Sequence, residues 1–400
     1  DINTLDVFIV SSGATMNATG VSTFSATNAS SNSGTATLST VSTGGTINMS
    51  SVGGSGGFTL IGSEKNDSLT GSGNNDILEI KSTGAGDGDT LDGAGGTDTL
   101  KLSTGTHTLA NDNFLKNIEE LETNSSGSTV VLTGQTEAFT ITGGAGNDII
   151  TAGSGDDIIT SGGGTDSLTG AAGTDTFKVT AGIVTINDLI NGDHFVVSNS
   201  ATATANNVGN YTAQAATSNA GTATINSATG NTTIDMSGST SGGFKIVGSA
   251  GVNQFTGGKG NDIITGGAGA DTLTGGDGTD TFIFASSDLE EDPNSSIDAV
   301  KDLSSGEKIG IDNDLSWKKI NITDNTATPT LDNSTKDAYI QKIGGKYLLV
   351  IEKAADGSTK GYVELGTDKP GEPGKWSQET INGINYLSII ENVCKLKFKN

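Results

Sequence analysis

The feature that most constrains this chain is a nonapeptide that recurs twelve times, in three blocks of four. The middle block (block 2, residues 143–178) reads GGAGNDIIT, AGSGDDIIT, SGGGTDSLT and GAAGTDTFK. Each of these copies carries Asp at its sixth place and an apolar residue at its eighth. Repetition with such a short, fixed period predicts a coil of stacked turns, in which each turn buries a few side chains against its neighbours.

The two other blocks keep the same register. Block 3 (residues 248–283) reads GSAGVNQFT, GGKGNDIIT, GGAGADTLT and GGDGTDTFI. Block 1 (residues 62–101) reads GSEKNDSLT and GSGNNDILE, then a four-residue insertion (Ile80–Thr83), then GAGDGDTLD and GAGGTDTLK. A flexible linker rich in Gly, Asp and Thr is the alternative. An apolar residue at the eighth place of every copy argues against it.

The nonapeptides resemble those of the RTX (repeats-in-toxin) family, which implies a calcium-binding parallel β-roll. The residue types suit that chemistry. Glycines allow positive φ and tight turns whose carbonyl groups point inward. The sixth-place Asp offers a hard oxygen ligand for Ca²⁺ at about 2.3–2.6 Å. The eighth residue heads a short strand and points into the roll, as expected for Ile150, Ile159, Leu168 and Phe177.

In such a roll two nonapeptides make one turn, so loops two repeats apart should stack and share an ion. The expected pairs are Asp67 with Asp89, Asp76 with Asp98, Asp148 with Asp166, Asp157 with Asp175, Asn253 with Asp271, and Asp262 with Asp280. Asn253 lacks charge and Lys65 lies in the loop of Asp67, so we expect weak or absent binding at these two sites. The loop glycines of the expected sites are Gly143, Gly144, Gly146, Gly153, Gly155, Gly162, Gly164, Gly173, Gly257, Gly258, Gly260, Gly267, Gly269, Gly276 and Gly278.

The charge of the chain follows the repeats. The net charge is −25, of which −20 falls in residues 1–285, and the chain contains no Arg. Without a cation this acidic load repels itself, and no basic face exists to meet the phosphates of a nucleic acid. No 18-residue apolar run predicts a membrane span, and the single cysteine, Cys394, excludes an internal disulfide. No signal peptide is visible, and the strand-like start LDVFIV suggests a processed or partial chain.

A longer duplication lies above the nonapeptides. GTATL (34–38), TINMS (46–50) and GGFTLIGS (56–63) lead into block 1, and GTATI (221–225), TIDMS (233–237) and GGFKIVGS (242–249) lead into block 3 at a nearly constant offset. These segments alternate apolar residues with Thr or Ser, which favours short strands. Residues 111–122 (NDNFLKNIEELE) fit either a short helix or a loop and a strand. The expected fold is all-β, a parallel β-roll or β-solenoid with three calcium-binding blocks and a small C-terminal β-rich domain.

The expected domains follow from these boundaries. They are a solenoid lead-in (1–61), block 1 (62–101), rungs without calcium (102–142), block 2 and its cap (143–197), a second lead-in (198–247), block 3 and its cap (248–311), and the C-terminal domain for secretion or assembly (312–400).

Two further resemblances concern export and the cell surface. The segment TFIF…SSIDAVKDLSSGEKIGID after block 3 resembles the one that follows the β-roll in serralysin-type proteases and other type I secreted proteins. The phrase NIEELET (117–123) is similar to one in bacterial S-layer proteins built with RTX blocks. The resemblance implies export through a one-step channel with an uncleaved C-terminal signal. The basic ending CKLKFKN departs from that pattern.

No catalytic constellation is visible in the sequence. A GGSGG run (53–57) matches GxSxG, but a nucleophile elbow needs Asp and His partners, and only His107 and His194 occur. We therefore expect a protein that is not an enzyme: a calcium-binding structural subunit of an S-layer or sheath at a bacterial cell surface. It would assemble with copies of itself into a lattice or filament and could contact a surface glycan. The alternatives are a fragment of an RTX adhesin and the carrier part of a secreted enzyme.

Overall fold

The computed structural model describes residues 2, 6–81, 84–85, 88–110, 113, 115–285, 297–303, 307–311, 338–343, 346–352, 360–364, 376–381 and 384–389. Every regular element within these residues is a β-strand, which confirms the all-β prediction. The chain divides into unit 1 (Asp1–Asp188 and Gly192–Ala203) and unit 2 (Leu189–Asn191 and Thr204–Asn400). β25 (Thr202–Val208) begins in unit 1 and ends in unit 2.

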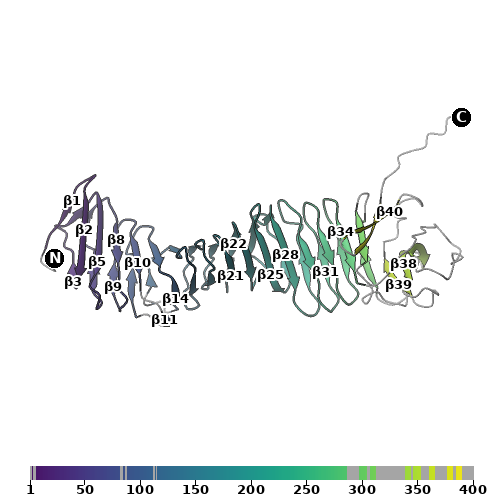
Figure 1. Ribbon diagram of the computed structural model, residues 1–400, viewed down its shortest axis with the longest axis horizontal. Helices are drawn as coiled ribbons and strands as arrows, with labels where there is room; N and C mark the ends of the chain where they lie inside the picture. Colours follow the sequence, from purple (N-terminus) through teal and green to yellow (C-terminus); the bar gives the residue numbers. More distant parts are fainter. Residues whose placement is uncertain are drawn as a thin grey trace, which may run out of the picture. The chain divides into compact units, whose positions relative to one another are not determined.

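Unit 1 is a coil in which each strand pairs in parallel with the strand one turn further along the chain (Figure 1). Its longest sheet, called here the long sheet, contains β2 (Thr15–Val21), β5 (Thr35–Thr40), β8 (Phe58–Ile61), β10 (Ile77–Ile80), β13 (Thr99–Leu102), β16 (Glu120–Glu122), β18 (Thr140–Thr142), β20 (Ile158–Thr160), β22 (Thr176–Val179) and β24 (His194–Val197). The early turns complete the coil with β1 (Ile9–Val10), β4 (Ser31–Asn32) and β7 (Gly53–Gly54), and with β3 (Thr23–Ser25), β6 (Thr46–Asn48), β9 (Ser68–Thr70), β12 (Thr90–Asp92) and β15 (Leu115–Lys116). The later turns use β11 (Gly84–Ala85), β14 (Gly105–Thr108), β17 (Ser128–Val131), β19 (Ile149–Thr151), β21 (Thr165–Thr169) and β23 (Ile183–Ile186).

One row of buried side chains runs along the long sheet. Its members pair in register from turn to turn and are all fully buried: Leu38, Leu60, Leu78, Leu100, Leu121, Ile141, Ile159, Phe177 and Phe195. The turns between neighbours differ in length, because the turn from Leu60 to Leu78 is shorter than the turn from Leu78 to Leu100. The row therefore keeps its register while the length of the turn changes.

The nonapeptides explain this core because each contributes a strand whose middle residue points inward. Side chains alternate between the two faces of a strand, so a short strand centred on the eighth residue buries that side chain and turns its two neighbours outward. The eighth residue of all twelve copies is at most 1% exposed: Leu69, Leu78, Leu91, Leu100, Ile150, Ile159, Leu168, Phe177, Phe255, Ile264, Leu273 and Phe282. The pairing of Ile150 with Leu168, which holds the same place two repeats later, confirms that two nonapeptides make one turn of block 2.

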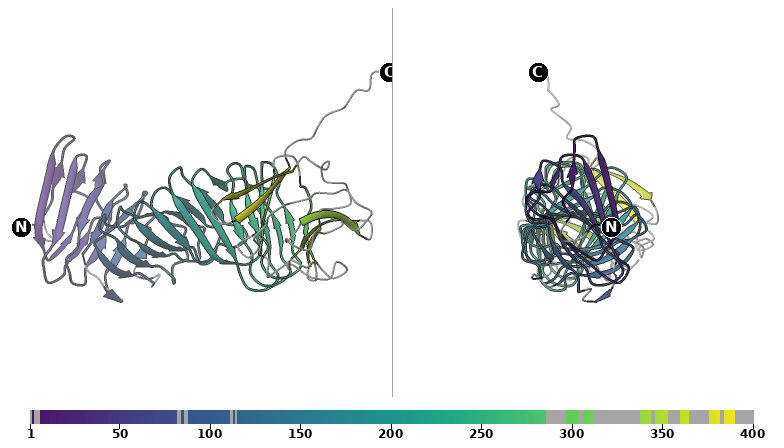
Figure 2. Two further views of the ribbon diagram at one scale, coloured as in Figure 1. Left: turned by 45° about the vertical axis from the view of Figure 1, so that its right-hand side comes forward. Right: turned by 90° about the vertical axis from the view of Figure 1, so that its left-hand side faces the viewer.

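Unit 2 repeats this parallel coil (Figure 2). One of its faces contains β26 (Tyr211–Thr212), β29 (Thr233–Asp235), β31 (Gln254–Thr256), β33 (Thr272–Thr274) and β35 (Asp298–Val300). Another face contains β28 (Thr222–Ser227), β30 (Lys245–Val247), β32 (Ile263–Thr265), β34 (Thr281–Phe284) and β36 (Lys308–Ile311). The short strand β27 (Ser218–Asn219) precedes β28 in the chain. The described strands beyond residue 312 are antiparallel hairpins: β37 (Ala338–Ile343), β38 (Lys346–Glu352), β39 (Lys360–Glu364), β40 (Trp376–Ile381) and β41 (Ile384–Ile389). They extend two sheets of unit 2, because β39 pairs in parallel with β35 and β41 pairs antiparallel with β36.

Each unit contains one copy of the duplicated lead-in segment, and the two copies have the same local structure. β5, β6 and β8 correspond to β28, β29 and β30 in order and sequence, and β30 is shorter than β8 by its first residue. In unit 1 the side-chain amide of Asn32 donates to the carbonyl of Gly57 (2.6 Å) and accepts from the N–H of Gly34 (3.0 Å). In unit 2 Asn219 makes the same two bonds with Gly243 and Gly221.

Two other expectations concern single segments. Within residues 111–122, the described part forms β15 and β16, so the loop-and-strand alternative holds there rather than the helix. The segment after block 2 forms β23 and β24, which pair with β21 and β22 and extend the coil by one more turn.

Candidate calcium sites

The sixth-place carboxylates form a ladder of hydrogen bonds between turns. In each of the six expected pairs, the backbone N–H of the first residue donates to Oδ1 of the Asp one turn later, at 2.6–2.9 Å. Asp148, for example, donates to Asp166 at 2.9 Å, and Asp157 donates to Asp175 at 2.8 Å. The sixth-place side chains of all twelve copies are buried. The structure therefore brings together every pair expected from the sequence.

The second oxygen of these carboxylates distinguishes the sites. Oδ2 of Asp98, Asp166, Asp175 and Asp280 is buried and receives no hydrogen bond. A buried carboxylate oxygen without a donor or cation is strongly destabilising, because it has lost its hydration and gained nothing. These atoms therefore mark positions at which a cation would complete the structure.

The pKa values of several sixth-place carboxyl groups are raised. Burial, followed by the charges of Asp193, Asp157 and Asp188, raises the pKa of Asp175 to about 7. Burial likewise raises the pKa of Asp262 to about 7 and that of Asp157 and Asp166 to about 6. Because desolvation disfavours the charged form, each group needs either a proton or a counter-charge, and the neighbouring carboxylate adds to that need.

Two different structural features require glycine in the loops: a positive φ at some positions and a close approach of neighbouring atoms at others. The fourth-place Gly173 and Gly278 have φ of 132° and 145°, in a region that L side chains rarely adopt, as expected for the tight turn. By contrast Gly143, Gly144, Gly146, Gly153, Gly155, Gly257 and Gly258 do not have left-handed φ values, so the expectation of positive φ is wrong for them. A Cβ on Gly155 would overlap the backbone of Glu137 on the previous turn, and one on Gly170 would overlap Oδ2 of Asp175. Close approach requires glycine at these places.

This donor set fits Ca²⁺ through main-chain as well as side-chain oxygens. In the part of the chain that the structure describes, no three His, Cys, Asp or Glu side chains come together as a metal cluster. Ca²⁺ takes about 6–8 oxygen ligands, and backbone carbonyl groups are among those it accepts. Two stacked Asp residues and the carbonyl groups of the two tight loops can supply such a sphere. The carboxylates would neutralise the ion, and the ion would bridge successive turns.

Three acidic residues outside the nonapeptides extend the ladder, and sequence reasoning did not identify them as site residues. The N–H of Asp175 donates to Asp193 Oδ1 at 2.9 Å, and the N–H of Asp271 donates to Asp298 Oδ1 at 2.8 Å. The N–H of Asp98 donates to Glu119 Oε2 at 2.8 Å. Asp193 follows Asp175 at the same spacing at which Asp175 follows Asp157, so the period of block 2 was the signal that could have found it.

Two further residues that the sequence analysis did not identify, Asp188 and Asp302, bind the last loops of blocks 2 and 3. Asp188 accepts from the N–H groups of Gly170 (3.0 Å) and Ala171 (2.7 Å). In unit 2, Asp302 accepts from the N–H groups of Gly275 and Gly276, both at 2.8 Å. Each carboxylate thus fixes the start of the fourth nonapeptide. The dipeptide Asp-Leu that follows both blocks is the sequence signal of this clamp.

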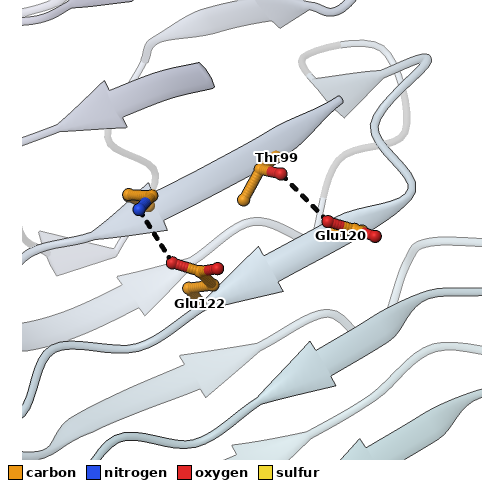
Figure 3. A network of polar contacts seen from close by, with 4 residues as sticks. Thr99, Glu120 and Glu122 are labelled. Atoms are coloured by element: carbon orange, nitrogen blue, oxygen red, sulfur yellow. Dashed lines mark hydrogen bonds and ion pairs between the residues drawn. The ribbon is translucent and has the colours of Figure 1, made fainter. Parts of the chain in front are cut away.

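The outer face of the long sheet carries a different polar cluster (Figure 3). Lys101 Nζ lies 3.0 Å from a carboxylate oxygen of Glu122, and Thr99 Oγ1 donates to Glu120 at 3.1 Å. Nearby, residues that include Glu64, Glu79 and Lys81 line an open polar groove of about 700 Å³. Both Lys101 and Glu122 are partly exposed, so their ion pair contributes little stability. The groove lacks the buried, unsatisfied carboxylates that distinguish the loops.

The two histidines and the GGSGG run occupy framework positions. His107 is buried in β14 with Nε2 2.8 Å from the carbonyl oxygen of Ser103, and His194 in β24 has Nδ1 3.1 Å from Thr176 Oγ1. Gly53 and Gly54 form the short strand β7 rather than the strand-to-helix turn of a nucleophile elbow.

Comparison with known families supports the calcium assignment. Residues 52–79, 142–177 and 247–282 match the RTX calcium-binding nonapeptide repeat, which accounts for a quarter of the chain. The chain therefore contains RTX repeats, which bind calcium and are typical of secreted proteins, and its fold is an all-β parallel solenoid. No curated protein matches the chain. Among the described residues, no helix has the length and apolar character needed to cross a membrane.

Proposed function

We propose that this chain is an extracellular structural protein that folds on Ca²⁺ after export and assembles with copies of itself on a bacterial cell surface, as an S-layer or sheath subunit. The observation that carries the calcium-dependent folding is the set of buried carboxylate oxygens without donors in stacked loops, as at Asp166 and Asp175. The ligand pairs would be the pairs of two Asp residues in the hydrogen-bonded ladder, extended by Asp193 and Asp298.

Calcium would act mainly as a folding switch. The sites do not exist in the unfolded chain, so the free energy of ion binding adds to the free energy of folding. Extracellular calcium modules bind the ion at about 10⁻⁴–10⁻³ M. At the low calcium concentration of the cytosol the acidic loops would repel each other and keep the chain open for export. Outside the cell the same loops would close.

Self-assembly is supported by repetition and by composition. Two copies of a lead-in and block unit occur in one chain, with matching Asn32 and Asn219 bonds. The outward positions of the described rungs are rich in Thr, Ser and Asn. A net charge of −25 makes divalent cations suitable bridges between copies. We infer a homo-oligomeric lattice or filament, in which the C-terminal β-rich residues contribute to secretion or assembly.

Negative-stain electron microscopy and circular dichroism test the proposal together. In millimolar Ca²⁺ we expect full β-structure and ordered sheets, tubes or filaments. In excess chelator the assemblies should disappear and the β-structure should be lost in part, and equal Mg²⁺ should restore neither. A variant with Asp148, Asp157, Asp166 and Asp175 all changed to Ala should require at least tenfold more Ca²⁺ to fold, because Ala offers neither an oxygen ligand nor an N–H donor to the loop. A chain that keeps its full β-structure in chelator would contradict calcium-driven folding.

Folded chains that remain monomeric in calcium would contradict the structural role alone. That result would favour an RTX adhesin fragment or the carrier part of a secreted enzyme. The polar groove on the outer face of the long sheet, which Lys101 and Glu122 also line, would then be the first surface to test for glycan binding.

A further inference from the structure

Asn253 breaks the pattern of the ladder in one atom only. It is the sixth residue of the first nonapeptide of block 3, where the other eleven copies carry Asp. Its side chain is fully buried, and its backbone N–H donates to Asp271 Oδ1 at 2.8 Å, as in every other pair. The loop therefore has the fold of a calcium loop, with an amide nitrogen in place of the second carboxylate oxygen.

The orientation of this amide is fixed by Thr232. Oδ1 of Asn253 accepts from the backbone N–H of Thr232 at 3.0 Å and from its hydroxyl group at 2.7 Å. A backbone N–H can only donate, so the oxygen of the amide must face Thr232. The nitrogen must consequently face the interior of its own loop.

Nδ2 of Asn253 lies among three carbonyl oxygens. It is 3.1 Å from the carbonyl oxygen of Ser249, 3.4 Å from that of Gly251 and 3.4 Å from that of Gly266. The first two belong to its own nonapeptide, and Gly266 begins the nonapeptide one turn later. One donor nitrogen thus lies where carbonyl groups of two stacked loops converge. These are the oxygen ligands that Ca²⁺ prefers.

Carboxylates at the same place have the opposite hydrogen-bonding character. Oδ2 of Asp262 accepts from the N–H of Gly258 at 2.9 Å, and Oδ2 of Asp148 accepts from the N–H of Gly144 at 3.1 Å. An ionised carboxylate cannot donate to a carbonyl group, whereas the amide has two N–H groups to offer. An Asp loop must therefore recruit a cation to hold its carbonyl groups together, and the Asn loop does not.

We propose that the side-chain amide of Asn253 takes the place of a calcium ion and excludes the cation from the first loop of block 3. Unit 2 then contains one turn that closes without metal, directly after its lead-in. The remaining loops of the block can add to this turn as calcium arrives. The inference rests on the proposed calcium-dependent folding of the Asp loops.

The first test counts bound calcium in the full chain by equilibrium dialysis and elemental analysis. Asn253→Asp should gain one Ca²⁺ per chain over the wild type at saturation, and the reverse change in the next loop, Asp262→Asn, should lose at least one. An Asn253→Asp count equal to that of the wild type would overturn the exclusion of calcium by Asn253.

The second test measures the amide directly and does not depend on calcium binding elsewhere. Asn253→Ser removes both N–H donors without adding charge, but it also removes the Oδ1 acceptor of Thr232. Asn253→Asp, which keeps that acceptor and lacks the N–H donors, is therefore measured beside it and should exchange faster than the wild type as well. In excess chelator, hydrogen exchange of the β31 amides should be about tenfold faster in the Asn253→Ser variant than in the wild type, because a buried hydrogen bond is lost. Equal exchange rates would overturn the metal-free turn. A wild type that binds no calcium would instead refute the proposed function, and the exchange result would still decide the role of the amide.

Discussion

The first two loops of block 1 and the last two loops of block 2 share one motif but satisfy their carboxylates differently. In block 1, Oδ2 of Asp67 accepts from the N–H (2.6 Å) and hydroxyl group (3.0 Å) of Ser63. Oδ2 of Asp76 likewise accepts from the N–H of Ser72 and from its hydroxyl group at 3.1 Å. In block 2, Oδ2 of Asp166 and of Asp175 has no donor. A donor to Oδ2 from the second place of the nonapeptide, present for Asp67 and Asp76 and absent for Asp166 and Asp175, thus lowers the need of a loop for its ion.

The largest expected effect of this difference is seen on removal of calcium. In excess chelator we expect hydrogen exchange at β21 and β22 to increase at least a hundredfold, because uncompensated buried charges cost about 3–5 kcal/mol. At β9 and β10 the increase should be below tenfold, since Ser63 and Ser72 remain as donors. Exchange mass spectrometry with and without calcium measures both, and β6 in the lead-in serves as the internal reference. Equal increases in the two blocks would contradict the comparison.

Protons should partly replace calcium in block 2. The pKa values of Asp157, Asp166 and Asp175 in the fold (about 6, 6 and 7) lie above the 3.8 of an ordinary Asp. Groups with a raised folded pKa stabilise the fold fully below about pH 4, and this contribution is lost as the pH rises through about 6–7. In chelator, acidification from pH 7.5 to 5 should therefore slow exchange at β21 and β22 about tenfold or more. Faster exchange at pH 5, after correction for the intrinsic rate, would refute this assignment.

The smallest effect isolates the hydroxyl group of Ser72. Ser72→Gly gives this loop the glycine that half of the second places carry, and it removes one hydrogen bond to Asp76. In chelator the local stability of β10 should fall by about 1 kcal/mol, roughly fivefold faster exchange. Saturating calcium should reduce that difference. The exposed Ser126→Gly change corrects for the added backbone freedom. A loss no larger than in this control would show that the Ser72 hydroxyl group does not stabilise the loop.

Much of the coil could be predicted from the sequence because its core residues recur at a fixed place in each nonapeptide. The eighth-place residues, for example Leu168 and Phe177, are buried as predicted, and the sixth-place pairs stack. Asp193 and Glu119 accept hydrogen bonds from the ladder although neither belongs to a glycine-rich nonapeptide. Only their spacing of one turn from the preceding Asp places them there, so the motif did not predict them. The sequence also did not show that many loop glycines are required by close contacts with a neighbouring turn. The backbone that a Cβ on Gly155 would overlap lies one full turn earlier, at Glu137.

The buried row of the long sheet keeps its register although the turn from Leu78 to Leu100 is longer than the turn before it. The number of residues in a turn can therefore vary at the corners of the coil, whereas it stays constant in the calcium loops and the strands. Insertions and deletions can accumulate at a corner without shifting any side chain from the inside to the outside, because strand pairing restarts from the same buried position. A coil of this kind can diversify its surface by lengthening corners while the residues that hold the turns together stay unchanged.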